Sequence, residues 1–514
     1  MTIPDIIRHS GYLCVNRNNT DHEGTQIQHA YTQRYAYDFI DGELVIHAYE
    51  SIPEIYDRPI ILGHGYDNTK YLFCLPFGFE KLSVFHPFPR DMKVRPEFVI
   101  KDFTPGTVFN EARICFDELQ YFCPSEAVVS ENDSGDVVFL RSGSIKIKEF
   151  EVSLNLIKCQ VKINLSTAGS VGFARSHMEA VTEIIIHFTA TDNLEFISNL
   201  YHLVDMVFSF ICNRRNTTFR SMKLSGLYHG KMFCDHKQVE CDKRTDCEVF
   251  FYDRYREEPE GINIISKTWN ASYLIHRIDK LFQIVAQDID SDKETGGYIS
   301  INSIHPSIKR RNLIDLQQSL QITGAFEFYV RKYLPSMVEE KDHHRAMKKI
   351  FDDIISDPSS SGKLKKLAKS MSSHIIREPA LEDKIWKAYK GYTNWTPLKN
   401  CILEEWFSED EIKALGHEAN EWRNELAHSK RSYEPSIDTI RAIRLIEHFN
   451  YAIVLRQIGY DDEEIKGILK EILVRNDKPQ NQNETQMQPI DGGKNSDNEP
   501  IEETKDSSAE SGTE

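Results

Sequence analysis

The C-terminal half of the chain is organised around Ser408–Lys430, SEDEIKALGHEANEWRNELAHSK. Ser408 followed three residues later by Glu411 is a capping box, in which the hydroxyl and the carboxylate each satisfy a free backbone N–H at a helix start. Apolar residues then recur three and four positions apart, which is the spacing of one buried helical stripe. They are Ile412, Leu415, Ala419, Trp422 and Leu426. The stretch therefore predicts a long amphipathic helix that packs against other helices.

Three polar residues with useful chemistry lie at the far end of this helix: Arg423, Asn424 and His428. An arginine keeps its charge and a histidine titrates near neutrality, so together they form a minimal set for handling a phosphodiester. Asn424 and His428 share a helix face, whereas Arg423 lies about 140° away from His428 in an ideal helix. For the two to converge, the last turn must loosen or the arginine side chain must wrap around the helix.

Two interpretations of this helix end stay open from the residues alone. One is a catalytic site. The other is an ordinary helix end, in which Arg423 pairs with an acid on a neighbouring helix and His428 caps its own helix. The bare pattern of Arg, four to six residues, then His does not decide, because the chain contains it four times, about as often as chance predicts. The four pairs are Arg17/His22, Arg58/His64, Arg423/His428 and Arg441/His448.

Position separates the four pairs. Arg17/His22 lies in a polar turn, and Arg58 precedes a proline, which disfavours helix. Arg441 and His448 are seven residues apart, two helical turns, which is too far for both to contact one phosphate. Only Arg423 and His428 lie at the end of a strongly predicted helix.

Helical patterns dominate the chain from about residue 263 to residue 475. Pro335 stops one predicted helix, and the stretch DPSSSG at Asp357–Gly362 is typical of a loop. Gly459 suits a helix C-cap. The other helices are predicted at Tyr273–Ile289, Asn312–Tyr333, Lys363–Ile376, Pro397–Trp406, Ser436–Ile458 and Glu464–Val474.

The first 260 residues or so have the short, alternating patterns of antiparallel strands. In Ser142–Asn155 the alternation slips by one position between Ile147 and Phe150, which suits a β-bulge. Gly63–Phe77 contains turn residues followed by the apolar run of a strand. Thr191–Arg214 has helical spacing, an N-cap at Asn193 or Asp192, and the composition of a helix that covers the sheet.

These patterns predict an α+β multidomain fold. We expect a β-rich N-terminal domain at 1–295, an all-α helical bundle at 300–475, and a disordered acidic tail at 476–514. The chain of 514 residues has a net charge of −17, which argues against nonspecific coating of nucleic acid or membrane. The charge is near −11 in residues 1–300, near +1 in 301–475 and near −7 in the tail. The helical part is thus the likelier half to meet a polyanion.

No secretory signal or membrane span is evident, and the 10 cysteines lack the density of a disulfide scaffold, so we expect a cytoplasmic protein. Cys234, Cys241 and Cys247, with His236 nearby, leave zinc binding undecided. Their spacing differs from the paired Cys-x-x-Cys geometry of strong zinc motifs, and ordinary thiols are the favoured interpretation. Asp342-His343-His344 has no evident further ligands. The sequence therefore predicts no metal site and no cofactor.

The helical half, with Arg423-Asn424-x3-His428 placed before a buried helix, resembles a HEPN domain. The hallmark of this family is Arg–x4–6–His with Asn, Asp or His directly after the arginine. More narrowly, residues 1–475 resemble ApeA-like proteins, which pair a β-rich N-terminal domain with a C-terminal HEPN domain. The similar segments are Ile61–Phe77, ILGHGYDNTKYLFCLPF, and Asn312–Tyr333, NLIDLQQSLQITGAFEFYVRKY.

This resemblance implies a metal-independent endoribonuclease that acts in abortive-infection defence against phage by cleaving host RNA such as tRNA. His428 would move a proton from the 2′-OH or to the departing 5′-oxygen. Arg423 would stabilise charge on the phosphate, and Asn424 would orient His428 or bind a phosphate oxygen. The alternative is a HEPN protein that binds RNA or a protein partner without catalysis.

The resemblance also implies a homodimer through the HEPN domain, because two motifs that meet at a two-fold axis supply both an acid and a base. We expect exposed apolar surface on Ser436–Ile458 to form part of that interface. The N-terminal domain would sense a phage-derived activator or hold the nuclease inactive. Candidate residues for binding RNA phosphates are Lys430, Arg431, Lys363 and Lys366, with Arg441 as a further candidate, although a solvated helix face is the more common role of such lysine clusters.

Overall fold

The computed structural model describes most of the chain between residues 9 and 473. The described ranges are 9–15, 33–40, 43–47, 60–67, 69–75, 92–123, 130–131, 137–138, 144–171, 176–213, 217–234, 237–252, 272–295, 316–333, 342–375, 379–391, 396–402, 407–427 and 435–473. The predicted tail at 476–514 and the predicted domain boundary at 295–300 lie largely outside these ranges.

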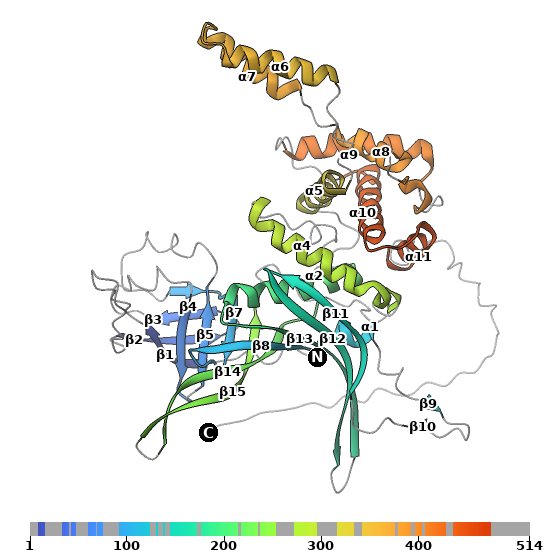
Figure 1. The fold of residues 1–514 in the computed structure, drawn as a ribbon. Helices are drawn as coiled ribbons and strands as arrows, with labels where there is room; N and C mark the ends of the chain where they lie inside the picture. The colour runs from blue at the N-terminus through green and yellow to red at the C-terminus, as the bar shows by residue number, and fades with distance from the viewer. Residues whose placement is uncertain are drawn as a thin grey trace, which may run out of the picture. The chain divides into compact units, whose positions relative to one another are not determined.

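A 13-stranded sheet occupies the N-terminal part, in the spatial order β11-β12-β13-β8-β14-β15-β7-β5-β4-β1-β2-β3-β6 (Figure 1). Among the described residues, all its strand pairs are antiparallel. This confirms the predicted β-rich half. The strands are β1 His9–Val15, β2 Gln33–Ile40, β3 Glu43–His47, β4 Ile60–Gly65, β5 Lys70–Cys74, β6 Met92–Val94, β7 Phe98–Lys101, β8 Thr107–Ile114, β11 Ser144–Leu154, β12 Ile157–Val171, β13 Ser176–Thr191, β14 Ser221–Cys234 and β15 Lys237–Phe251, with β9 Ser130–Glu131 and β10 Val137–Val138 as a separate pair.

Two details of the sheet bear on the sequence patterns. The register of β11 against β12 shifts between Lys146 and Lys148, so the predicted bulge is confirmed and Ile147 is the extra residue. The turn expected at Gly63–Gly65 is wrong, because β4 continues through Gly65 and the turn follows it. Gly63 instead allows two strands to approach: a Cβ there would lie 2.7 Å from the Phe73 ring.

The helices are α1 Asp117–Phe122, α2 Leu194–Cys212, α4 Ile278–Thr295, α5 Leu316–Tyr333, α6 Asp342–Ser356, α7 Gly362–Ile375, α8 Leu381–Lys390, α9 Glu409–Ala427, α10 Ile437–Gln457 and α11 Asp462–Ile472. Short 3-10 helices occupy Ser272–Arg277 and Leu398–Asn400. The apolar helix predicted at Pro397–Trp406 is therefore only one 3-10 turn within its described residues, 397–402. The other predicted helices are confirmed, with their ends shifted by up to six residues.

Helix α2 covers the sheet as predicted. The Asn193 side chain caps it by accepting hydrogen bonds from the backbone N–H groups of Glu195 and Phe196. By length and composition α2 is apolar enough to cross a bilayer, but most of its side chains are buried inside the protein. Helix α4 packs beside α2 and against β11, where the Phe150 and Phe282 rings meet edge-on at 5.2 Å between centroids.

The sheet-covering helix and the C-terminal helices share one hydrophobic core. The Tyr451 ring of α10 stacks on the Phe210 ring of α2 at a centroid distance of 4.5 Å, and its hydroxyl donates to the Phe210 carbonyl. Residues 1–475 form one compact unit. The two halves that differ in pattern are thus joined by buried contacts.

Helices α9 and α10 have the clearest sequence signals in the helical half, and the structure shows what each signal does. Four of the five residues of the predicted stripe on α9 are buried, with Ile412 and Ala419 fully inaccessible to solvent, and the fifth, Leu426, is half-buried. One half of the predicted capping box forms: the Glu411 carboxylate accepts hydrogen bonds from the Ser408 backbone N–H at 2.9 Å and from the Ser408 hydroxyl at 2.8 Å. Ser436 caps α10, and Gly459 follows it with a φ of +96°, a conformation that favours glycine.

The Glu411 cap gives a pH-dependent prediction. The Ser408 N–H, helped by Arg441, lowers the pKa of Glu411 to about 2. Because the carboxyl would titrate at its ordinary, higher pKa of 4.5 in the unfolded chain, the cap stabilises fully above that pH and loses its effect as the pH falls toward 2. We expect Glu411→Ala to cost about 1 kcal/mol at pH 7. Thermal unfolding of both proteins at pH 7 and pH 3.5 should show the difference shrinking at the lower pH; a constant difference would contradict this account.

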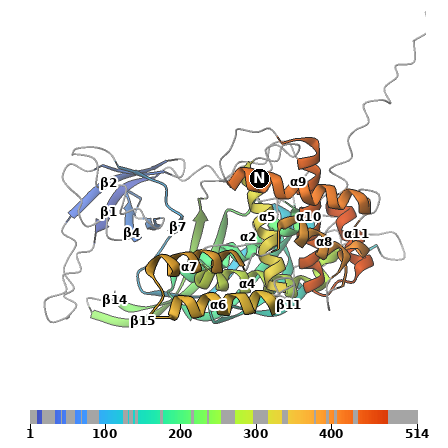
Figure 2. The same cartoon turned by 90° about the horizontal axis from the view of Figure 1, so that it is seen from above.

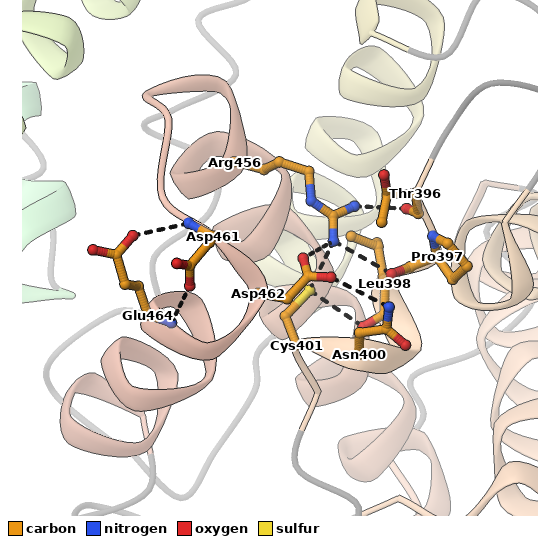
Figure 3. Close-up of polar contacts among 9 residues, drawn as sticks. All are labelled: Thr396, Pro397, Leu398, Asn400, Cys401, Arg456, Asp461, Asp462 and Glu464. Carbon is orange, nitrogen blue, oxygen red and sulfur yellow. Dashed lines mark hydrogen bonds and ion pairs between the residues drawn. The ribbon is translucent and has the colours of Figure 1, made fainter.

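Arg456, at the end of α10, ties three C-terminal segments together (Figure 3). Its guanidinium donates to the carbonyls of Thr396 and Pro397, at 2.6 and 3.3 Å, and to the Cys401 sulfur. It also pairs with Asp462 at the start of α11. The short 3-10 segment and α11 are therefore held against α10 by one largely buried charge.

Removing this charge should destabilise the helical half. We expect Arg456→Met to cost about 2–3 kcal/mol, because the carboxylate and the carbonyls lose charge-assisted hydrogen bonds. Lys470→Met, on the exposed face of α11, is the matched control and should be near neutral. Thermal unfolding of the two variants measures the difference, and equal midpoints would show that the Arg456 contacts contribute little.

Candidate functional site

The last turn of α9 places Arg423 beside the buried stripe, directly after the core residue Trp422. The Arg423 guanidinium donates to Glu327 of α5 at 2.9 Å. A second, long contact of 3.5 Å reaches the side-chain oxygen of Asn424. The first of these contacts confirms the pairing with an acid on a neighbouring helix that the sequence left open.

Glu327 is shared between two cations. Its other carboxylate oxygen accepts from Lys384 of α8 at 2.8 Å, so one carboxylate links α5, α8 and α9. The Lys384 side chain is 1% exposed, and the Glu327 side chain is 13% exposed. A buried ammonium is strongly destabilising unless a carboxylate compensates its charge. Lys384 therefore fixes Glu327, and Glu327 in turn fixes Arg423.

Arg423 differs from Lys384 in its access to solvent, because 38% of its side chain is exposed. A guanidinium carries five N–H donors, and the hydrogen bonds to Glu327 and Asn424 occupy only part of them. The group is therefore held in place on one side and accessible on the other. Such an arginine can bind an incoming phosphate without first losing much side-chain freedom.

The structure brings together only part of the predicted site. Asn424 is exposed next to Arg423. His428 follows the last residue of α9, Ala427, and lies outside the described residues, as do Lys430 and Arg431. Lys363 and Lys366 are exposed in the first turns of α7, a helix that packs against α6. Among the described residues, no hydrogen bond or ion pair links them to Arg423.

The other Arg–His pairs have different environments where the structure describes them. Arg441 pairs with Glu411 at 2.8 Å, and the fully buried His448 hydrogen-bonds the Arg444 carbonyl through its Nδ1 at 2.7 Å. His64 lies within β4, and its partner Arg58 is outside the described residues, as is the whole of the Arg17/His22 pair. Of the described arginines in these pairs, Arg423 lies near the C-terminal end of its helix, whereas Arg441 lies near the N-terminal end of α10.

The cysteines of the undecided zinc site are separated by the strand register. Cys241 and Cys247 lie six positions apart on β15, about 20 Å along an extended strand. Cys247 is buried and contacts the Asp102 carbonyl through its sulfur, and burial raises its thiol pKa to about 12. The three cysteines therefore cannot share one zinc ion. Within the described ranges, no three His, Cys, Asp or Glu residues are grouped as metal ligands.

The apolar surface of α10 is used inside the protein, which corrects the expectation that it remains exposed. Its large side chains, including Ile443, Leu445 and Ile446, are buried in the shared core. Ile437, 78% exposed, is the one large apolar side chain that α10 leaves on the described surface. An interface formed by this helix would have to rely on its first turn.

The sequence interpretation did not identify Glu327 and Lys384. A signal was present for the first of them, because Glu327 is a single acid within the apolar run AFEFYV of α5. An acid flanked by aromatic residues in a helix often marks a buried ion pair. Its partners could not be chosen, because Lys384 and Arg423 come from two other helices that are 57 and 96 residues away in sequence.

Comparison of the sequence with protein-family models matched none of them. The same holds for the curated proteins and for the solved structures, neither of which gave a significant match.

Proposed function

We propose that the chain is a metal-independent endoribonuclease of the HEPN type, with Arg423, Asn424 and His428 as its catalytic residues. The observation that carries this proposal is the state of Arg423: an arginine fixed by Glu327 on one side and open to solvent on the other, five residues before a histidine. The helical surroundings of α5, α8, α9 and α10 agree with such a domain.

The chemistry uses the RNA as its own nucleophile. The 2′-OH attacks the adjacent phosphorus, the P–O5′ bond breaks, and the products carry a 2′,3′-cyclic phosphate and a 5′-OH. His428 accepts the 2′-OH proton or donates one to the leaving oxygen. Arg423 stabilises the charge that develops on the non-bridging oxygens, and Asn424 orients the histidine or binds a phosphate oxygen.

A second copy of the chain completes this scheme. One histidine cannot readily act as base and acid in the same step, whereas two-fold pairing of the α9 ends supplies one histidine for each role. The β-rich half would restrain the nuclease until it meets a phage-derived activator, and host RNA would then be cleaved. The full-length protein should therefore be non-toxic in uninfected cells and become toxic on phage infection; equal toxicity in both conditions would contradict this role.

The test is cleavage of RNA by the purified full-length protein in the presence of EDTA, with the product ends identified. The proposal expects 2′,3′-cyclic phosphate and 5′-OH ends and activity that EDTA leaves unchanged. Loss of activity in EDTA would indicate a metal site instead. Binding of RNA without cleavage, unchanged by Arg423→Ala, would favour the non-catalytic alternative, in which Arg423 serves only to pair with Glu327.

A further inference from the structure

Helices α6 and α7 form a hairpin with an exposed apolar face. They pack side by side, as both views show (Figures 1 and 2). Large apolar side chains are usually buried, yet five on this hairpin are 44–57% exposed: Met347, Ile350, Leu364, Leu367 and Met371. With the half-buried Ile354 of α6 they make up what we call the hairpin face.

The residue spacing places both stripes on the same side of the hairpin. Met347, Ile350 and Ile354 recur three and four positions apart on α6, as do Leu364, Leu367 and Met371 on α7. The less exposed residues Phe351 and Ile355 of α6 and Ala368 of α7 mark the side on which the two helices meet. At about 100° per residue, each stripe lies about 90° from that side of its own helix. Because the helices run antiparallel, rotations of the same sense bring the two stripes to one face.

The six side chains also match in height along the hairpin. Counted from the loop at Asp357–Ser361 with a rise of about 1.5 Å per residue, they form three levels. Ile354 is level with Leu364, Ile350 with Leu367, and Met347 with Met371. Each level presents one side chain from each helix, which is half of a four-residue layer in a four-helix bundle.

We infer that the hairpin face binds the hairpin face of a second copy of this chain, so that two hairpins close into an antiparallel four-helix bundle. A two-fold axis parallel to the helices puts α6 of one copy over α7 of the other, and the three levels become three complete apolar layers. Six partly exposed apolar side chains gathered on one face form the kind of patch that often marks a protein–protein interface.

The charges at the edges of the face fit this pairing. Asp353 flanks the α6 stripe near the loop, and Lys363 and Lys366 flank the α7 stripe at about the same height; all three are exposed. In the two-fold arrangement, Asp353 of each copy lies opposite Lys363 and Lys366 of the other copy. Opposite charges at bundle edges set partner choice and orientation. Lys363 and Lys366 then serve the interface rather than RNA.

The first experiment measures the mass of the full-length protein in solution by sedimentation. We expect Leu367→Glu to weaken self-association by about tenfold or more, and to give particles of 59.6 kDa where the hairpin face is the only interface. Lys369→Glu adds the same charge on the polar side of α7 and should leave the dissociation constant unchanged. A monomeric wild type, or a Leu367→Glu variant that associates as tightly as the wild type, would overturn the inference. Pairing through the α9 ends alone would survive Leu367→Glu, so the two interfaces are distinguishable.

A charge reversal tests the orientation independently of the apolar layers. Asp353→Lys should weaken the assembly, because two lysine-rich edges then face each other. Adding Lys363→Asp to the same chain restores opposite charges and should restore the assembly. Circular dichroism confirms that each variant is folded. If the double variant associates no more tightly than the Asp353→Lys variant, the two charged edges do not face each other as described.

Discussion

Arg423→Ala should lower RNA cleavage by about 10²–10³-fold, the effect of removing one group that stabilises charge in a transition state. The substitution removes a guanidinium that is 38% exposed and held by Glu327 at 2.9 Å. Arg423→Lys keeps the charge but loses the planar donor geometry, so it should recover only part of the activity. Initial rates on a defined RNA, with EDTA present, measure both effects.

The matched control is Arg113→Ala, which removes an arginine of similar exposure from strand β8. The Arg113 side chain is 44% exposed and pairs with Glu111 at 2.7 Å, so its removal should cost at most about 1 kcal/mol of stability. Cleavage should remain close to that of the wild type. If Arg113→Ala and Arg423→Ala lose activity equally while both stay folded, position at the end of α9 is not what matters.

Glu327→Ala should be the most destabilising single change, at about 3–5 kcal/mol. It leaves the Lys384 ammonium, 1% exposed, without the carboxylate oxygen 2.8 Å away. It also releases Arg423, so cleavage by the folded fraction should fall as well. Thermal unfolding gives the first effect, and cleavage well below the unfolding temperature gives the second.

A double variant separates these two consequences. Glu327→Met with Lys384→Met removes both buried charges, and stability should recover most of what Glu327→Ala loses. Arg423 stays without its acid, so we expect cleavage to remain impaired. Recovery of activity together with stability would show that Glu327 matters for folding alone and does not position Arg423.

The local elements were predictable because their signals lie within a few residues of one another. The α9 stripe, the Asn193 cap, Gly459 and the slip at Ile147 each follow from neighbouring side chains. The helix predicted at Pro397–Trp406 was wrong, because apolar residues without a helical period do not specify a helix. The described part is instead held by Arg456, from another helix.

The rest of the site depends on contacts that no local pattern encodes. The spatial order of the 13 strands brings β8 between β13 and β14, which are more than 60 residues away from it in sequence. The sharing of Glu327 between Lys384 and Arg423 likewise joins three helices. The sequence therefore indicated which arginine to consider, but not which acid holds it.

Cleavage of one defined RNA by the wild type and by His428→Ala, compared in EDTA, tests the central claim most directly. The account predicts that the wild type cuts and leaves 2′,3′-cyclic phosphate ends, whereas the folded His428→Ala protein shows no cleavage above background. Full activity of the His428→Ala protein would contradict it.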